Sequence, residues 1–195
     1  MKSVLNIGGI QKLSLIDYPE KMAAIIFTQG CNMVCPYCHN PQLVYPDMFE
    51  PILNETEFFA FLEKRRNLLQ AVVVTGGEPT VQKDLKDFIK RIKNYGYAVK
   101  LDTNGTNPHV LEDLIKENLI DFIAMDIKSP LQKYNLFYKG DLNKIESSVA
   151  IIKSSKVPHL FRTTFDKELL SQADMETIKQ FVFPSQYIIQ PCTKS

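Results

Sequence analysis

The sequence is short of several features that would indicate particular classes of protein. It holds only 4 cysteines in 195 residues, and its 23 basic and 22 acidic residues leave a formal net charge of +1. A charge so close to zero gives no overall field that would attract nucleic acid or an anionic membrane surface. No apolar run approaches the roughly 20 residues of a membrane-spanning helix, and the start of the chain lacks the pattern of a secretory signal peptide. We therefore expect a cytoplasmic protein that binds neither nucleic acid nor membrane.

Low-complexity tracts and internal repeats are also absent from the sequence. A chain of 195 residues has the length of one ordinary domain and can bury most of its apolar surface. We expect residues 1–195 to form a single domain, in which residues 1–22 are an N-terminal entry segment and residues 23–195 form the main body of the fold.

Three of the four cysteines, Cys31, Cys35 and Cys38, lie within eight residues with the spacing C-x3-C-x2-C. Thiolates are the usual protein ligands of iron–sulfur clusters, and a 4Fe–4S cluster normally takes four of them. Three cysteines in one short loop would leave one iron of such a cluster open to a ligand that is not protein.

Three other interpretations of this loop remain open at the level of sequence. Residues 35–39 spell C-x-x-C-H, the attachment motif of c-type haem, but haem attachment would need export and would leave Cys31 without a role. A zinc site of three cysteines and His39 would place adjacent residues on one tetrahedral ion, which is strained. Disulfides do not persist in reducing compartments, and these cysteines are crowded. The alternative from another functional class is thus a non-catalytic metal-binding module.

From Ala23 onward, short apolar runs alternate with amphipathic segments. The runs are continuous rather than alternating, which is typical of parallel strands buried on both faces. Leu85, Phe88, Ile89 and Ile92 follow the helical period, and Gly96 is placed to end that helix. The pattern predicts five helices, with apolar stripes within 58–62, 85–92, 111–115, 142–152 and 175–182, and six strands at Ala23–Thr28, Ala71–Thr75, Ala98–Thr103, Phe122–Asp126, Leu160–Thr164 and Tyr187–Gln190.

Alternating strands and helices predict an α/β fold with a parallel sheet. A closed eight-stranded barrel typically needs about 250 residues, so the chain is too short for one. Ligands of parallel α/β folds sit at the carboxyl ends of the strands. Polar groups do follow the predicted strands there: the cysteine loop, Gly76-Gly77-Glu78-Pro79, Asp102-Thr103-Asn104-Gly105, Asp126-Ile127-Lys128 and Arg162-Thr163-Thr164.

The cysteine spacing, followed one strand–helix unit later by Gly76-Gly77-Glu78-Pro79, resembles the radical S-adenosylmethionine (SAM) superfamily. The resemblance decides between a flat sheet and an open partial (β/α)6 barrel of the radical SAM type, in favour of the barrel. It implies that Cys31, Cys35 and Cys38 hold a 4Fe–4S cluster whose open iron binds SAM. Reductive cleavage of SAM would then give a 5′-deoxyadenosyl radical, and no side chain would need to act as a general acid or base.

The resemblance also assigns expected roles to residues at the strand ends. Gly76, Gly77 and Glu78 would hold the ammonium group of SAM, and Tyr37 would pack near the adenine unless it only anchors the loop. Further cofactor-binding roles, for the SAM carboxylate, the substrate backbone or a monovalent cation beside that carboxylate, would fall to Asp102, Asn104, Asp126, Lys128 and Arg162. For Lys128 the alternative is a solvated lysine, and for Arg162 it is a structural ion pair.

Within the superfamily, the sequence is similar to the activating proteins of anaerobic ribonucleoside-triphosphate reductase. The similarity covers about residues 10–130 and includes 14–19, 27–31, 35–41, 101–105 and 124–128. It implies that the substrate is one glycine of a partner glycyl-radical enzyme and that reduced flavodoxin or ferredoxin donates the electron. The alternative is a radical SAM enzyme acting on a small metabolite, as in deazapurine synthesis. Unlike many activating enzymes, the chain has no further C-x-x-C pairs, and we expect Cys192 to lie in an exposed tail and to bind no metal.

Overall fold

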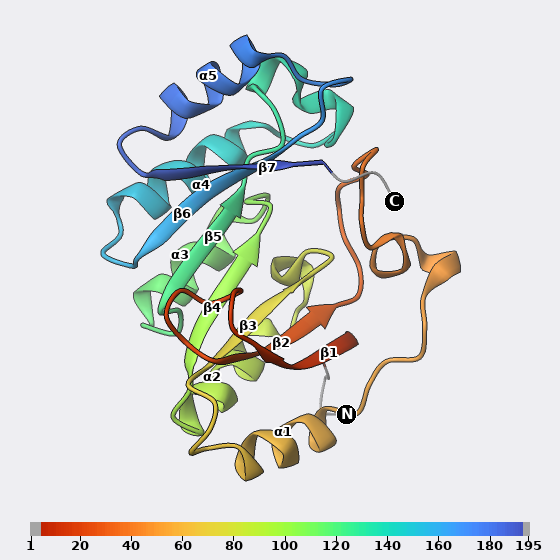
Figure 1. The fold of residues 1–195 in the computed structure, drawn as a ribbon, viewed down its shortest axis with the longest axis vertical. Coiled ribbons are helices and arrows are strands. Elements are labelled where there is room, and N and C mark those ends of the chain that lie inside the picture. The colour runs from red at the N-terminus through yellow and green to blue at the C-terminus, as the bar shows by residue number, and fades with distance from the viewer. Residues whose placement is uncertain (1–4, 193–195) are drawn as a thin grey trace.

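The computed structural model describes residues 5–192, which form one curved seven-stranded sheet with helices on it (Figure 1). Residues 1–4 of the expected entry segment and 193–195 of the expected tail lie outside the described residues. The strands follow one another across the sheet in chain order: β1 Ile7–Ser14, β2 Ala23–Thr28, β3 Ala71–Gly76, β4 Ala98–Thr103, β5 Phe122–Asp126, β6 His159–Phe165 and β7 Gln186–Pro191. The helices are α1 Glu55–Lys64, α2 Leu85–Asn94, α3 Pro108–Lys116, α4 Asn143–Ser154 and α5 Gln172–Val182.

Strands β2 to β7 are parallel, and β1 pairs with β2 in the antiparallel sense. In the part of the chain that the structure describes, β1 and β7 form the two edges of the sheet and do not meet. The fold is therefore an open partial barrel, as the sequence predicts. The sequence predicts six strands, and the structure adds a seventh, β1, which lies within residues 1–22.

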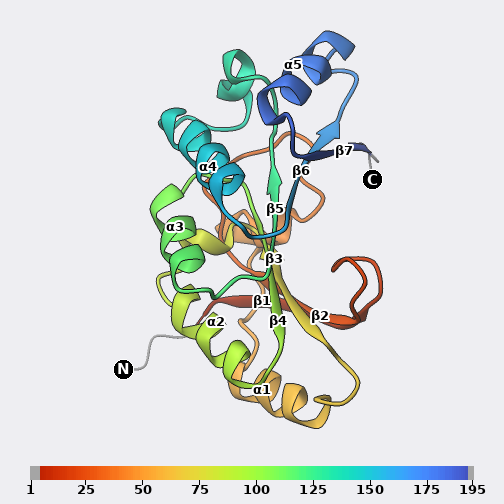
Figure 2. The same ribbon diagram turned by 90° about the vertical axis from the view of Figure 1, so that its left-hand side faces the viewer.

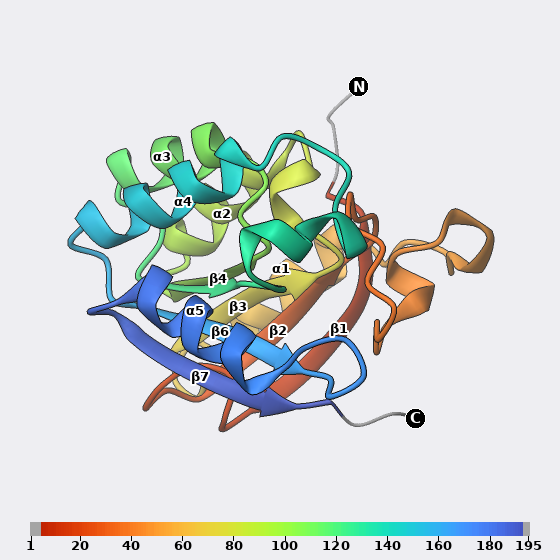
Figure 3. The same ribbon diagram turned by 90° about the horizontal axis from the view of Figure 1, so that it is seen from above.

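The two faces of the sheet bury different side chains. Val72 and Val74 of β3 join the large core beneath the helices, whereas Ala71 and Val73 face a small core on the opposite side. Tyr18, from the loop between β1 and β2, packs into the small core. Figures 2 and 3 show α2, α3 and α4 together on the face of the large core. Both faces of the central strands are thus buried, which explains their continuous apolar sequences.

Local signals set several helix boundaries. Asn54 caps α1, its side chain accepting a hydrogen bond from the backbone N–H of Thr56 at 2.8 Å. Pro108 occupies the first turn of α3 after Asn107, and Gly96 follows α2 with a φ of 86°. Among the described residues, none of the helices combines the length and apolar character needed to span a membrane.

Candidate active site

A cavity of about 260 Å³ lies at the carboxyl ends of the parallel strands. The long loop between β2 and α1 runs beside these ends, coloured orange in Figure 1. Sequence-predicted residues that line the cavity are Cys31, Cys35, Tyr37, Cys38, Gly76, Gly77, Glu78, Asp102, Asn104, Asp126, Lys128 and Arg162. All twelve predicted site residues therefore surround one space, although they come from five separate segments of the chain.

The cysteine loop is held in place by its own backbone and by a later loop. The backbone N–H of Met33 donates to Cys31 Sγ at 3.4 Å, and the N–H of Cys38 donates to the carbonyl of Cys35 at 3.0 Å. The N–H of Val34 donates to the carbonyl of Phe137, which follows the 3₁₀ helix Leu131–Leu136, at 3.0 Å. Burial raises the pKa of the Cys31 thiol to about 11 and also raises the pKa of Cys35. Loading iron onto these thiols must therefore release protons.

The chemistry of the donor set suits an iron–sulfur cluster. The thiols of Cys31, Cys35 and Cys38 all lie on the wall of one cavity. Thiolates are the usual protein ligands of such clusters.

Gly76 and Gly77 bring the second predicted motif against the start of the cysteine loop. A Cβ atom at Gly77 would lie 2.2 Å from the carbonyl oxygen of Gly30, and one at Gly76 would lie 2.3 Å from the backbone nitrogen of Thr28. Backbone hydrogen bonds join the same segments, from Gly77 N–H to the Thr28 carbonyl and from Glu78 N–H to the Gly30 carbonyl. The space that a glycine leaves is thus filled by backbone of the preceding strand and loop.

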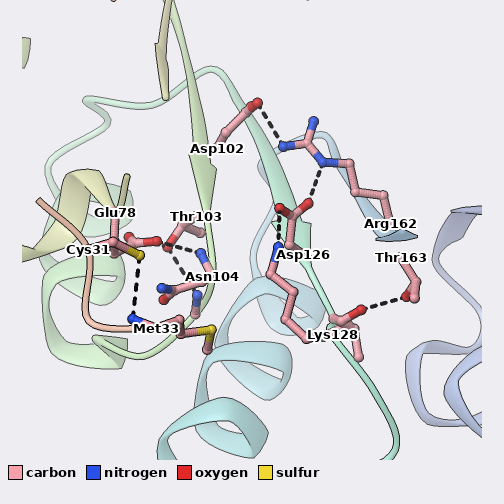
Figure 4. A network of polar contacts seen from close by, with 12 residues as sticks. Cys31, Met33, Glu78, Asp102, Thr103, Asn104, Asp126, Lys128, Arg162 and Thr163 are labelled. Carbon is pink, nitrogen blue, oxygen red and sulfur yellow. Dashed lines mark hydrogen bonds and ion pairs between the residues drawn. The ribbon is translucent and has the colours of Figure 1, made fainter. Parts of the chain in front are cut away.

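Glu78 joins the second predicted motif to the third. Its buried carboxylate accepts hydrogen bonds from the Thr103 hydroxyl at 2.7 Å and from the backbone N–H of Asn104 at 2.6 Å (Figure 4). It also accepts from the hydroxyl of Thr80 at 2.5 Å and its backbone N–H at 3.1 Å. Burial raises the pKa of Glu78, and these donors oppose the rise. Glu78 therefore fixes the ends of β3 and β4 relative to each other at the cavity wall.

A row of charged side chains continues from β4 to β6, as Figure 4 shows. Arg162 donates from Nη2 to Asp102 Oδ2 at 2.9 Å and from Nε to Asp126 Oδ1. Lys128 Nζ donates to Asp126 Oδ2 at 2.9 Å. Burial alone would raise the pKa of Asp126, but the adjacent Arg162 and Lys128 outweigh it and hold that pKa well below its usual value. Lys128 is accordingly a partly buried lysine paired with Asp126, and Arg162 forms ion pairs with both Asp102 and Asp126.

Tyr37 carries a buried polar atom that the described residues leave without a partner. Its hydroxyl accepts and donates no hydrogen bond there, while its ring packs on Phe137 with 5.6 Å between centroids. Burial raises the pKa of Tyr37 above its ordinary value. A hydroxyl placed in this way is suited to contact a molecule bound in the cavity.

Asn32 is a residue that the sequence analysis missed. Its side chain accepts from the Asn104 amide at 3.0 Å and donates to the Thr106 hydroxyl at 2.8 Å, which ties the cysteine loop to the loop after β4. The only signal in the sequence is its position directly after Cys31. The second missed residue is Tyr134, fully buried, whose hydroxyl accepts from the backbone N–H of Lys128 at 3.3 Å.

Cys192 takes no part in lining the cavity. It is partly buried rather than fully exposed, and its backbone N–H donates to the Phe165 carbonyl at 3.0 Å at the end of β7. The expectation that it binds no metal stays a prediction.

The family model that matches this chain describes the radical SAM superfamily and covers residues 25–175. The chain belongs to the radical SAM superfamily. Members of this superfamily use a 4Fe–4S cluster and SAM, and the three-cysteine loop on the cavity wall is the element of this chain that suits the cluster.

The radical SAM chain is similar to two curated proteins in sequence and to a solved structure in fold. A protein of Methanocaldococcus jannaschii, named as a glycyl-radical enzyme activating enzyme, is 41% identical over 187 residues, which span 90% of this chain and 75% of that protein. The 7-carboxy-7-deazaguanine synthase of Neisseria meningitidis is 30% identical over 138 residues, 70% of this chain and 57% of the synthase. The solved structure of anSMEcpe with bound AdoMet superposes with a TM-score of 0.63 at 20% identity, covering 85% of this chain and 49% of the other. That last likeness shows the shared fold.

Proposed function

We propose that this radical SAM enzyme activates a glycyl-radical enzyme by removing a hydrogen atom from one glycine of its partner. The observation that carries the proposal is the meeting of all twelve predicted residues around a single cavity. The choice of substrate rests on the relative from Methanocaldococcus jannaschii, which is more similar over more of the chain than the deazaguanine synthase.

Cys31, Cys35 and Cys38 would hold the cluster in this proposal. When bound, the cluster and SAM supply the one-electron chemistry that removes a hydrogen atom from the substrate. The protein's own part is to bind and orient these groups and to exclude water. Lys128 places a positive charge in the cavity close to Cys35, where it favours the thiolate form that a metal needs.

Other residues of the cavity wall suit the amino-acid part and the adenine of SAM. Gly76, Gly77 and Glu78 would lie beside its ammonium group, and Asn104 beside its carboxylate or the substrate backbone. Tyr37, with its unpartnered hydroxyl, would lie near the adenine. We leave a monovalent cation out of this proposal, because all four oxygens of Asp102 and Asp126 already accept from cationic side chains.

The partner we propose is anaerobic ribonucleoside-triphosphate reductase, with reduced flavodoxin or ferredoxin as the electron donor. The basis is the similarity of residues 10–130 to the activating proteins of that reductase. Thr164 and Gln190 extend the cavity wall to the ends of β6 and β7, next to the open edge of the sheet. A glycine-bearing loop of a partner would enter from that edge.

The decisive experiment mixes the anaerobically reconstituted protein, SAM and a reductant with that reductase. We expect a glycyl-radical signal by electron paramagnetic resonance and one 5′-deoxyadenosine formed per radical. A reductase in which the radical-bearing glycine is replaced by alanine should give no signal.

Cys35→Ala should lose iron, SAM cleavage and the signal together, whereas Cys192→Ala should keep all three. Reductive SAM cleavage with no signal from the reductase or any other glycyl-radical enzyme would contradict the proposed substrate. Zinc without iron after reconstitution would favour the metal-binding module.

A further inference from the structure

Lys100 is a buried lysine on β4 that the proposed function does not use. Its residue is 4% exposed, and its neighbours across the sheet are Val73 of β3 and Phe122 of β5. It lies two residues before Asp102, so both side chains point to the same face of the sheet. Lys100 Nζ forms an ion pair with Asp102 Oδ1. An ammonium group is costly to bury unless it is paired, so its place here calls for an explanation.

Lys100 completes a row of alternating charges across the sheet. In order, the row is Lys100, Asp102, Arg162, Asp126 and Lys128. Each of the four carboxylate oxygens in the row has one cationic partner: Lys100 and Arg162 on Asp102, and Arg162 and Lys128 on Asp126. Three positive and two negative groups leave the row with one positive charge in excess.

Each carboxylate oxygen in this row already accepts from an ammonium or guanidinium group, so a monovalent metal ion would have to compete with that group for the oxygen. It would also approach three fixed positive charges at short range, and the low polarity of a buried site strengthens that repulsion. The expectation that Asp102 and Asp126 bind such an ion therefore conflicts with the ion pairs of the structure.

We propose that the Lys100 ammonium group is a built-in cation that takes the place of a bound sodium or potassium ion beside Asp102. Lys100 is then a positioning residue: it holds Asp102, Asp102 holds Arg162, and Arg162 holds Asp126 beside Lys128 at the cavity. Its relevance to SAM rests on the proposed function, but the ion pair itself exists without cofactor. The inference can therefore be tested on the protein without cluster or SAM.

The test compares thermal unfolding midpoints in sodium, potassium and choline chloride at equal ionic strength. The wild-type midpoint should be the same in all three salts. Lys100→Ala should lower the midpoint in choline by roughly 10 °C, because Asp102 loses one partner in a buried site. Sodium, potassium or methylammonium, which fit the vacated space, should restore part of that loss in a saturable manner. Lys100→Met fills the space without charge and should stay destabilised in every salt.

Lys93→Ala is the matched control, because it also breaks an ion pair between a lysine and an aspartate. Lys93 Nζ lies 2.7 Å from Asp121 Oδ2, and the pair does not line the cavity. Its loss should produce no difference between the three salts. An Lys100→Ala protein that responds to the salts as Lys93→Ala does would overturn the inference.

The wild-type protein gives an independent answer should Lys100→Ala fail to fold. In sodium-23 NMR, the wild type should show no more saturable line broadening than Asp102→Asn does. Such broadening would mean that an ion binds beside Lys100 and would refute the proposal. Neither measurement involves radical chemistry, so a failure to activate the reductase would count against the proposed function alone.

Discussion

Gly77 tests whether the second motif and the cysteine loop depend on each other. Its Cβ position lies 2.2 Å from the Gly30 carbonyl oxygen, and that backbone leads directly into Cys31. Gly77→Ala should therefore destabilise the protein by about 3 kcal/mol and lower the iron bound after reconstitution. Urea unfolding and iron analysis measure the two effects.

Gly9→Ala is the control for Gly77→Ala. A Cβ at Gly9 would meet its nearest atom, Phe27 Cδ2, at 3.4 Å, an ordinary contact. The change should leave stability within about 0.5 kcal/mol and iron content unaltered. Equal iron content in the two variants would show that the loop does not depend on the close approach of Gly77.

The start of α5 carries a capping box whose acidic member has a second partner. Asp174 Oδ2 accepts from the Ser171 N–H at 2.7 Å, from the Ser171 hydroxyl at 2.8 Å and from Lys133 Nζ at 2.6 Å. The hydrogen bond from Lys133, followed by those from Ser171, lowers the pKa of Asp174 to about 2. The pair links α5 to the 3₁₀ helix Leu131–Leu136, which braces the cysteine loop.

Asp174→Asn should cost about 0.5 kcal/mol at pH 7, because its partner Lys133 is well exposed and solvent screens the ion pair. A carboxyl whose pKa is lowered on folding stabilises the protein above its unfolded pKa of about 3.9. That contribution should disappear as the pH falls from about 4 towards 2, so the two proteins should converge in urea unfolding at acid pH. Glu176→Gln removes an exposed carboxylate from the same helix, 4.0 Å from Lys179, and should change stability at pH 7 by less than about 0.5 kcal/mol. A difference that stayed constant down to pH 2 would assign the effect to the cap geometry and not to charge.

The strands that the sequence predicts are those whose burial comes from their own apolar residues. Ala71–Gly76 and Phe122–Asp126 fall where the continuous apolar runs place them, since both faces are covered. Strand β1 was missed because Gly8-Gly9 indicates a turn and because residues 11–13 are exposed, which breaks any apolar pattern. It forms through pairing with β2, and such pairing is not encoded locally.

The candidate site likewise has features that the sequence predicts and features that depend on the fold. Motifs with fixed spacing, such as the cysteine loop, could be predicted from the sequence because neighbours in the chain are neighbours in space. The ion pair of Arg162 with Asp126 depends on β5 and β6 pairing in the register that sets these two residues opposite each other. The sequence offers both residues but not that register. The hydrogen bond from the Asn104 side chain to the Asn32 side chain likewise requires the cysteine loop to fold back over the end of β4.

Taken as a whole, the molecule combines a well-packed sheet with one long loop that carries Cys31, Cys35 and Cys38. Residues 29–54, between β2 and α1, contain no regular structure beyond two 3₁₀ helices of three residues each. Among the described residues, most of the backbone hydrogen bonds of this loop join residues within it, such as Gly30 N–H to the Leu43 carbonyl at 2.7 Å, so they tie it only weakly to the sheet. The parallel strands beside it are paired on both sides and packed into the core. Stability should therefore be distributed unevenly, with the loop opening far more readily than the sheet.

Cluster loading should make this difference visible by hydrogen exchange. Metal binding stabilises only those states in which its ligands are assembled, so its free energy goes to the segment that would otherwise open. We expect amides of residues 31–45 to exchange at least about tenfold more slowly in the loaded protein, and amides of β3 and β4 to be unchanged. Cys35→Ala taken through the same reconstitution should show no slowing. Equal slowing across α2 to α4 would instead mean that the cluster stabilises the entire fold, and that the sheet is not an independent platform on which the loop closes around its metal.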